Sequence, residues 1–188
     1  MSLRHSYTII APLYDALLAA AGTGVRAVSL GQLPQQGDLD ILLSGIGSGL
    51  DLPYLPPCHG YVGLDLTAAM LSRAKLRIGS LRLNLIQGNS MSLPFADESF
   101  DHVVLHLILA VVPDATACLR ETARVLKPGG SVLILDKFLK PGETALIRRT
   151  LNVLSRHVVT RLDVVFEEVL ADVPQLKLKS DMPMLAGG

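Results

Sequence analysis

Five short apolar runs spaced along the chain constrain its fold more than any other feature of the sequence. They read DILLS, YVGLD, LRLNLIQG, HVVLHLIL and SVLILD, and stretches with helical spacing separate them. Apolar runs of about four to eight residues that alternate with helices are typical of a parallel sheet covered on both faces. The sequence therefore predicts an α/β fold with a doubly wound, mainly parallel sheet.

Helices between these runs can be placed from side-chain spacing and from capping residues. An opening helix is expected near residues 8–21, and residues 67–78 form a second helix that Thr67 can cap. Residues 113–126 predict a third helix, which ends at KPGG because Pro128 and two glycines cannot continue it. Beyond them, residues 142–173 have the spacing of two helices or one bent helix, and QLKLKS alternates like an edge strand.

Length and composition bound the class of protein. The 188 residues fit one domain over residues 1–188. Lys and Arg (17) balance Asp and Glu (17), so no net field steers the chain onto nucleic acid, and no nucleic-acid partner is expected. A charged fraction of 18% and a mean hydropathy of +0.42 are apolar for a soluble domain and favour a lipid or quinone substrate.

Several other classes of site are disfavoured by the sequence. Cys58 and Cys118 are far apart and outside any C-x-x-C motif, so neither a disulfide framework nor a zinc site is expected. On a strand, His102 and His106 would lie about 13 Å apart, too far to bind one metal ion. No run reaches about 18 uncharged apolar residues, and no export signal is found, so we expect a cytoplasmic protein without a transmembrane segment.

The first apolar run leads directly into a glycine loop. Gly45, Gly47 and Gly49 leave the main chain bare, so a tight turn can form and a ligand can lie against the backbone. Asp65 closes the next run about 20 residues later, where a carboxylate can accept hydrogen bonds from a ribose. A nicotinamide-binding loop has its third glycine three residues after the second, where this chain has Leu50. The G-x-G-x-G spacing therefore favours S-adenosylmethionine (SAM) over a nicotinamide cofactor. A turn that merely joins strand to helix is the structural alternative.

At these residues the sequence resembles the class I SAM-dependent methyltransferases, whose fold is Rossmann-like. The resemblance runs from about Tyr7 to Lys140 through GIGSGLDLPYLP, GLDLTAAMLSRAK, GNSMSLPFADESFDHVV and PDATACLRETARVLKPGGSVLILD, with APLYD resembling an N-terminal lid. It is strongest to the branch of bacterial phosphatidylethanolamine N-methyltransferases and ubiquinone and menaquinone methyltransferases. The resemblance is specific for fold and cofactor and weaker for the substrate.

The resemblance implies a set of cofactor-binding residues. Gly45, Gly47 and Gly49 would line the methionine end of SAM, and Asp65 would hold the ribose. The residues implied near the adenine are Leu66 and Met70 on its faces, and Asn89, Ser90 and Met91 along its edge.

Two positions depart from the family pattern. Asn89 replaces an acid but still accepts through its carbonyl oxygen. Leu43 replaces the acid that helps to anchor the ligand's ammonium group, a loss of about 1.5 to 3 kcal/mol in binding. Leu43 therefore supports an alternative function, that of a non-catalytic SAM-binding or fold-sharing interaction protein.

Candidates for the chemistry come from the ends of the fourth and fifth runs and from the lid. They are His106 and Asp136 as catalytic residues, and Tyr7 and Tyr14 as substrate or lid residues on a helix over about residues 7–21. Each also has a structural interpretation, because a lone histidine on an apolar strand is usually a core residue and helical tyrosines usually pack. Methyl transfer needs positioning and exclusion of water, and a base only if the acceptor must lose a proton.

The sequence thus predicts transfer of a methyl group from SAM, with S-adenosylhomocysteine (SAH) as product. A small-molecule or lipid-like acceptor is expected, with a phosphatidylethanolamine-type amine slightly favoured over a quinone ring carbon and with peripheral membrane contact. The resemblance implies a seven-stranded sheet, but only DMPMLAGG follows LKLKS and no last antiparallel strand can be placed. An uncovered edge favours pairing, so a homodimer is also expected.

Overall fold

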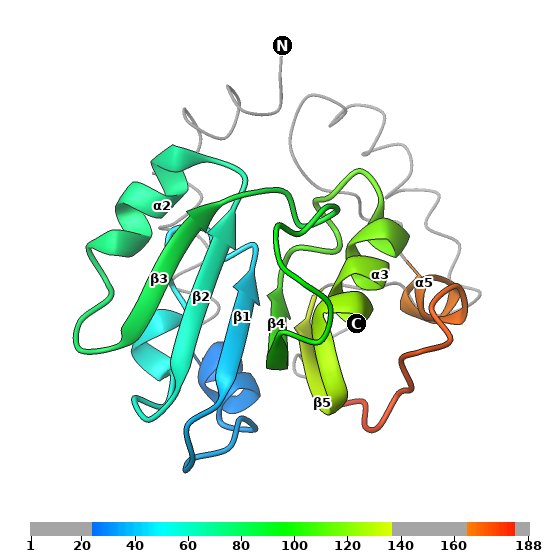
Figure 1. Ribbon diagram of the computed structural model, residues 1–188, viewed down its shortest axis with the longest axis horizontal. Helices are drawn as coiled ribbons and strands as arrows, with labels where there is room; N and C mark the ends of the chain where they lie inside the picture. Colours follow the sequence, from blue (N-terminus) through cyan, green and yellow to red (C-terminus); the bar gives the residue numbers. More distant parts are fainter. Residues whose placement is uncertain (1–23, 137–164, 183–188) are drawn as a thin grey trace.

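A single parallel sheet organises the computed structural model, which describes residues 24–136 and 165–182. Its strand order is β3-β2-β1-β4-β5, and every neighbouring pair is parallel (Figure 1). The strands are β1 (Asp40–Ser44), β2 (Gly60–Asp65), β3 (Arg82–Gln87), β4 (Phe100–His106) and β5 (Leu126–Leu135). The predicted α/β fold with a parallel, doubly wound sheet is confirmed.

Short helices connect the strands. They are η1 (Leu52–Tyr54), α2 (Ala68–Lys75), α3 (Ala115–Val125) and α5 (Phe166–Ala171), and residues 24–30 are also helical. Thr67 caps α2 as predicted, because its Oγ1 accepts from the Met70 amide at 3.4 Å. Asp114 caps α3 in the same way, accepting from the Ala117 amide at 2.9 Å.

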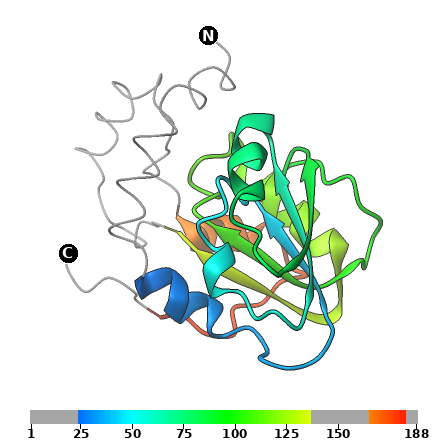
Figure 2. The same cartoon turned by 90° about the vertical axis from the view of Figure 1, so that its left-hand side faces the viewer.

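Alternating side chains of the strands build two apolar cores, one on each face of the sheet. Leu42 points into a core covered by α3 and α5, whereas Ile41 and Leu43 point into a core covered by residues 24–30, η1 and α2. Figure 2 shows residues 24–30 and η1 on one side of the sheet and α3 on the other. The central strands β1 and β4 are mostly apolar runs because both of their faces are covered, whereas the outer strand β3 alternates exposed and partly buried residues.

The strand order creates a switch point between β1 and β4. The chain moves outward from β1 to β3 and then crosses to the other side of β1 to form β4. In open parallel sheets, ligands bind where the strand order reverses, beyond the carboxyl ends of the strands. The loops that follow β1 and β4 are therefore the expected place for a functional site.

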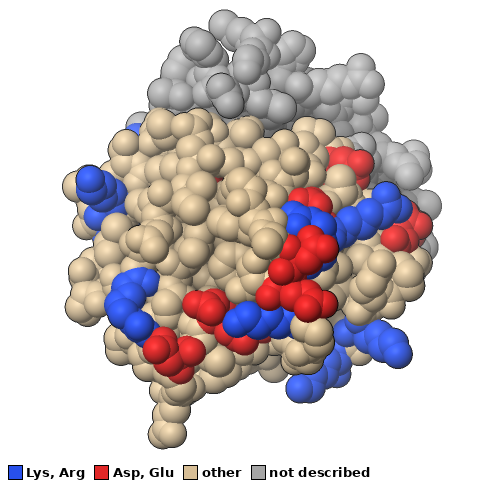
Figure 3. Space-filling model, in the orientation of Figure 1, with Lys and Arg blue, Asp and Glu red and all other residues tan. Residues whose placement is uncertain are grey.

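Charges of both signs alternate on the face of the molecule that Figure 3 shows. Lys127 Nζ lies 3.0 Å from Asp101 and 3.2 Å from Asp40, and Arg124 lies 2.8 Å from Glu121. On this face the balanced charges of the sequence are arranged as local ion pairs rather than as a patch of one sign.

One detail of the sequence-based prediction is corrected. QLKLKS forms no strand, because no strand among the described residues bonds to it and Leu178 is 57% exposed. β4 ends at His106, where the fourth strand was expected to end, because Leu107 adopts a φ of 56° that no strand accommodates. The predicted lid over residues 7–21 and most of the predicted helices in 142–173 lie outside the described residues.

Within residues 24–136 and 165–182, we find no helix with the length and apolar character needed to cross a membrane. β3 and β5 are the outer strands of the described sheet, and each pairs on one side only. Homodimer formation stays a prediction.

Candidate functional site

The loop after β1 depends on glycine at its first position. Gly45 has a φ of 77°, and a Cβ placed on it would lie 2.6 Å from Cδ1 of Ile108. Its amide and that of Ile46 both donate to the Leu64 carbonyl of β2, at 2.8 and 2.9 Å. Gly45 thus lets the loop turn tightly between the ends of β2 and β4, where any side chain would collide with Ile108.

The main chain at Gly47 is less crowded than at Gly45. Its φ is 57°, and among the described residues no heavy atom beyond its chain neighbours lies within 4 Å of a Cβ placed on it. The Gly47 amide donates to Asp65 Oδ2 at 3.0 Å. Within the described part of the chain, open main chain at Gly47 therefore lies beside a carboxylate.

Asp65 stands at the end of β2 with an acceptor position to spare. Its Oδ1 accepts from the amide and the hydroxyl of Thr67, at 2.9 and 3.1 Å, while Oδ2 accepts from Gly47 alone. Burial raises the pKa of this carboxyl, and the bonds from Thr67 and Gly47 oppose that rise. Since a carboxylate oxygen can accept two bonds, Oδ2 can take one more from a ligand hydroxyl.

The two predicted adenine-flanking residues lie in different surroundings. Leu66 directly follows Asp65 and is 40% exposed. Met70 is buried at 6% in the base of α2. Leu66 offers an apolar platform next to Asp65, whereas Met70 supports α2 from within.

The predicted edge residues lie on the loop between β3 and β4, which packs against the end of β1. Ser44 donates to Ser90 at 2.9 Å, and Asn89 Oδ1 accepts from the Met91 amide at 3.0 Å. Ser90 is buried, and Met91 packs against the core beneath α3. The structure thus brings the 89–91 loop to the same edge of the sheet as the glycine loop.

Of the proposed catalytic residues, His106 ends β4 and is 7% exposed. Its Nε2 lies 3.1 Å from the Ser29 hydroxyl, and its Nδ1 lies 3.0 Å from Asp51 Oδ2. Asp136 follows β5, the neighbouring strand, and accepts from the Ala110 amide at 3.1 Å. Tyr7 and Tyr14 lie outside the described residues.

Sequence reasoning missed the charged group around His106. Asp51 pairs with the Arg26 guanidinium and faces His106, and all three side chains are buried. Burial acts to raise the pKa of Asp51, but His106 and Arg26 outweigh it and hold that pKa below its usual range. One signal was available, the acid two residues after the last glycine; nothing in the sequence marked Arg26 as buried.

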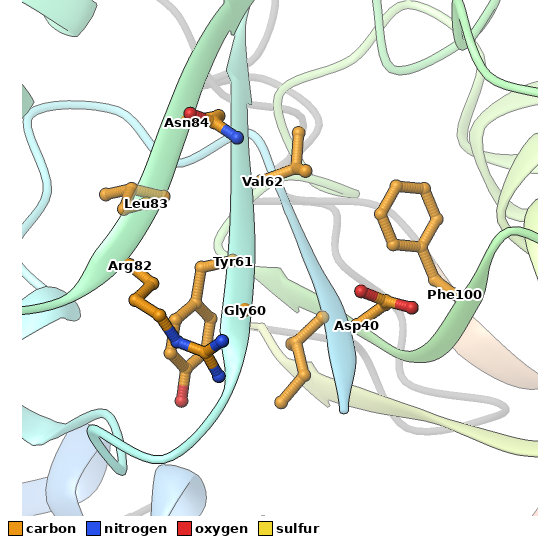
Figure 4. A pocket seen from close by; sticks show the side chains of 9 residues that line it. Asp40, Gly60, Tyr61, Val62, Arg82, Leu83, Asn84 and Phe100 are labelled. Atoms are coloured by element: carbon orange, nitrogen blue, oxygen red, sulfur yellow. The ribbon is translucent and has the colours of Figure 1, made fainter. Parts of the chain in front are cut away.

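A hollow of about 250 Å³ lies elsewhere on the molecule. Figure 4 shows it at the amino-terminal half of β1, β2 and β3, with Asp40, Arg82, Asn84 and Phe100 around it. The glycine loop and Asp65 lie at the opposite, carboxyl ends of these strands. This hollow is therefore separate from the candidate site.

The residues at the switch point fit a nucleoside ligand. Gly47 leaves main chain open, Asp65 has an acceptor for a ribose hydroxyl, and Leu66 provides an apolar surface for a base. The same loop has no G-x-G-x-x-G cradle for a pyrophosphate. Fold and site together define a Rossmann-like domain for an adenosine-containing cofactor such as SAM.

Comparison with known proteins agrees with this class. The model of a methyltransferase domain matches residues 42–134. The phosphatidylethanolamine N-methyltransferase of Cereibacter sphaeroides is 33% identical over 153 residues, which cover 79% of this chain and 75% of that protein. The demethylmenaquinone methyltransferase of Bacillus cereus is 45% identical over 78 residues, which cover 40% of this chain and 33% of that protein.

Among solved structures, the YcgJ protein of Bacillus subtilis superposes with a TM-score of 0.67 at 25% identity, covering 81% of this chain and 66% of that one. The chain belongs to the SAM-dependent methyltransferase family of the class I fold. It is a methyltransferase, and SAM is its cofactor. The methyltransferase relatives support an enzyme over the alternative of a non-catalytic SAM-binding or fold-sharing interaction protein.

Proposed function

We propose that the protein methylates the amine of a phosphatidylethanolamine-type lipid. The observation that carries this proposal is the extent of similarity to the Cereibacter sphaeroides enzyme, which covers 79% of the chain and 75% of that relative. Similarity to the demethylmenaquinone enzyme is higher in identity but covers only 40% of the chain. The apolar composition, with 18% charged residues, also suits a lipid acceptor.

In this proposal the described residues position the cofactor. SAM supplies an electrophilic methyl group, which an acceptor nitrogen with a free lone pair displaces from sulfur. Asp65 Oδ2, which accepts from the Gly47 amide, would also accept from a ribose hydroxyl, and the exposed Leu66 would pack against the adenine. The main chain of Gly45, Gly47 and Gly49 lines the methionine end, and the 89–91 loop borders the base. Holding the reactants together in a dry site supplies much of the rate enhancement.

Amine methylation releases a proton, and the strand ends offer two proposed groups to receive it. Asp136 is half-buried at the end of β5. His106 at the end of β4 has Ser29 at one ring nitrogen and Asp51 at the other, so it must give up a neighbour before it can act as a base. We therefore propose His106 as a residue that orders the site, while Asp136, whose Oδ2 accepts from the Ala110 amide, is the other candidate proton acceptor.

The acceptor can be tested with vesicles. The full chain is incubated with methyl-labelled SAM and phosphatidylcholine vesicles that contain phosphatidylethanolamine, with vesicles that contain demethylmenaquinone in its place, or with phosphatidylcholine alone. We expect label in mono- and dimethylated phosphatidylethanolamine only, and much less of it with Asp65→Ala. Label in the quinone alone would replace the proposed acceptor, and label in neither lipid would exclude both.

Peripheral membrane contact follows from a lipid acceptor and is part of the same proposal. Flotation of the protein with the phosphatidylethanolamine vesicles, compared with phosphatidylcholine vesicles, measures this contact directly. A cytoplasmic location stays a prediction from the sequence.

A further inference from the structure

Asp51 occupies an unusual position for an acidic residue. Among the described residues it is the only Asp or Glu whose side chain is buried, at 6% exposure. It follows Gly49 by two residues and precedes η1, yet it makes no side-chain capping bond to that helix. Its carboxylate is therefore directed to something other than the end of η1.

Three elements hold the Asp51 side chain. Arg26, from helical residues 24–30, donates to Oδ1, and His106, at the end of β4, faces Oδ2 at 3.0 Å. His106 Nδ1 has no well-aligned hydrogen bond within the described part of the chain, and its Nε2 faces Ser29. Arg26 thus holds one carboxylate oxygen and His106 lies beside the other, while each oxygen retains acceptor capacity.

This group lies at the switch point, next to the glycine loop. Ile108 lies two residues after His106, and its side chain contacts the position that a Cβ on Gly45 would occupy. Leu43 lies on the same face of the sheet, since it pairs with Val104 and both belong to the core beneath residues 24–30. Asp51 therefore reaches the end of the loop where β1 and β4 separate.

Stability does not account for a buried ion pair at this place. Removing Asp and Arg from water costs free energy that their attraction often fails to recover, and apolar replacements of such pairs are frequently as stable or more so. A ligand gives a reason. SAM carries a sulfonium and an ammonium cation at its methionine end, and Leu43 and the glycines of the loop bring no negative charge.

We propose that Asp51 supplies the negative charge for the cationic, methionine end of SAM, with Arg26 and His106 holding its carboxylate in position. This inference rests on the cofactor and not on the identity of the methyl acceptor. Because SAH lacks the sulfonium cation, Asp51 contributes to the preference for SAM over its product.

Binding of SAM and of SAH by calorimetry tests this role. We expect Asp51→Asn to weaken SAM binding by about tenfold or more and SAH binding by clearly less, because the change removes a charge and leaves the shape. Asp51→Glu, which keeps the charge, should retain much of the preference for SAM. Asp38→Asn serves as the matched control, because Asp38 is an exposed acid that also pairs with an arginine, Arg82.

A second variant separates the ligand role from the neutralisation of Arg26. Arg26→Met combined with Asp51→Asn leaves no unpaired charge, so it should fold, yet we expect it to keep the lowered preference for SAM over SAH. Recovery of the wild-type ratio in this double variant would overturn the proposal. So would an unchanged ratio in a folded Asp51→Asn. These experiments measure only SAM and SAH binding. They therefore test the role of Asp51 even if phosphatidylethanolamine proves not to be the methyl acceptor.

Discussion

Asp65 and Gly47 act as a pair at the scale of single residues. The Gly47 amide orients Asp65 Oδ2, and that oxygen has one acceptor position left for a ligand. The chain thus presents a carboxylate that is fixed before the cofactor arrives. Pre-organised acceptors lose little conformational entropy on binding, which makes this contact efficient.

Replacing Asp65 tests that contact. We expect Asp65→Ala to weaken SAM binding by about 1 to 3 kcal/mol, because a ribose hydroxyl loses its charged acceptor and the Gly47 amide loses its partner. Isothermal calorimetry measures the loss, and Asp38→Ala, at an exposed acid paired with Arg82, is the control. Equal affinities of the Asp65 variant and the wild type would mean that the ribose lies elsewhere.

Gly45 and Gly47 are expected to serve different purposes, the first protein stability and the second SAM binding. Gly45→Ala should lower the stability of the ligand-free protein by about 1 to 3 kcal/mol, because its Cβ collides with Ile108 at a positive φ. Gly47→Ala carries only the cost of its positive φ but places a methyl group in open space beside Asp65. It should therefore impair SAM binding more than folding.

Denaturant unfolding and SAM titration of these two variants give the comparison. Equal losses of stability in both would contradict the assignment of Gly47 to the ligand side of the loop.

The residues that carry local patterns could be predicted, and those that depend on distant contacts could not. Gly45, Gly47 and Asp65 follow from spacing within one β-loop-β unit. Asp51 has its partners 25 residues before it and 55 residues after it, at Arg26 and His106. A charged side chain is usually exposed, so only the folded chain identifies this pair as buried.

At the scale of elements, the 89–91 loop depends on α3. Arg124 of α3 donates to the carbonyls of Leu93 and Phe95, at 3.1 and 2.8 Å, and Glu121 accepts from the Leu93 amide at 2.7 Å. These bonds attach the connection between β3 and β4 to a helix of the opposite half of the sheet. The position of the site's second loop is therefore set by α3.

Arg124→Met should loosen this connection. We expect a loss of about 1 to 3 kcal/mol in stability, because two carbonyls lose a charged donor, and faster amide exchange at Met91 and Leu93. Arg120→Met, at an exposed position of the same helix, is the matched control. Hydrogen exchange by mass spectrometry measures the effect, and unchanged protection in the Arg124 variant would show that the loop holds its own conformation.

Helices and strands could be predicted from the sequence where a run of apolar residues marks a buried segment. All five apolar runs contain a strand, because runs of that length separated by helical stretches are typical of a parallel sheet. QLKLKS has the right alternation but lacks a neighbouring strand among the described residues, whereas β4 ends at His106 as expected, because Leu107 turns the chain. An alternating sequence favours a strand, but a strand forms only where a neighbouring strand offers hydrogen-bonding partners.

At the scale of the whole molecule, the two ends of the sheet differ in character. Lys127, Asp40 and Asp101 form an ion-paired group at the amino ends of β1, β4 and β5. The glycine loop, Asp65 and the buried Asp51 group gather at the carboxyl ends of β1, β2 and β4. A parallel sheet was predicted from the sequence, but its order, and hence the switch point, came from the structure.

Because the proposed cofactor site joins loops from both halves of the sheet, cofactor binding should stabilise the whole fold. A ligand at about 100 times its dissociation constant adds about 2.7 kcal/mol to the free energy of unfolding, which raises the Tm of a domain of this size by roughly 5 to 11 °C. We expect such a rise with SAM in a thermal scan, a smaller rise with Asp65→Ala, and with Asp51→Asn a rise that is reduced more for SAM than for SAH. No rise for the wild type at millimolar SAM would mean that the glycine loop and Asp65 do not form one binding site, since two loops joined by a ligand must unfold together.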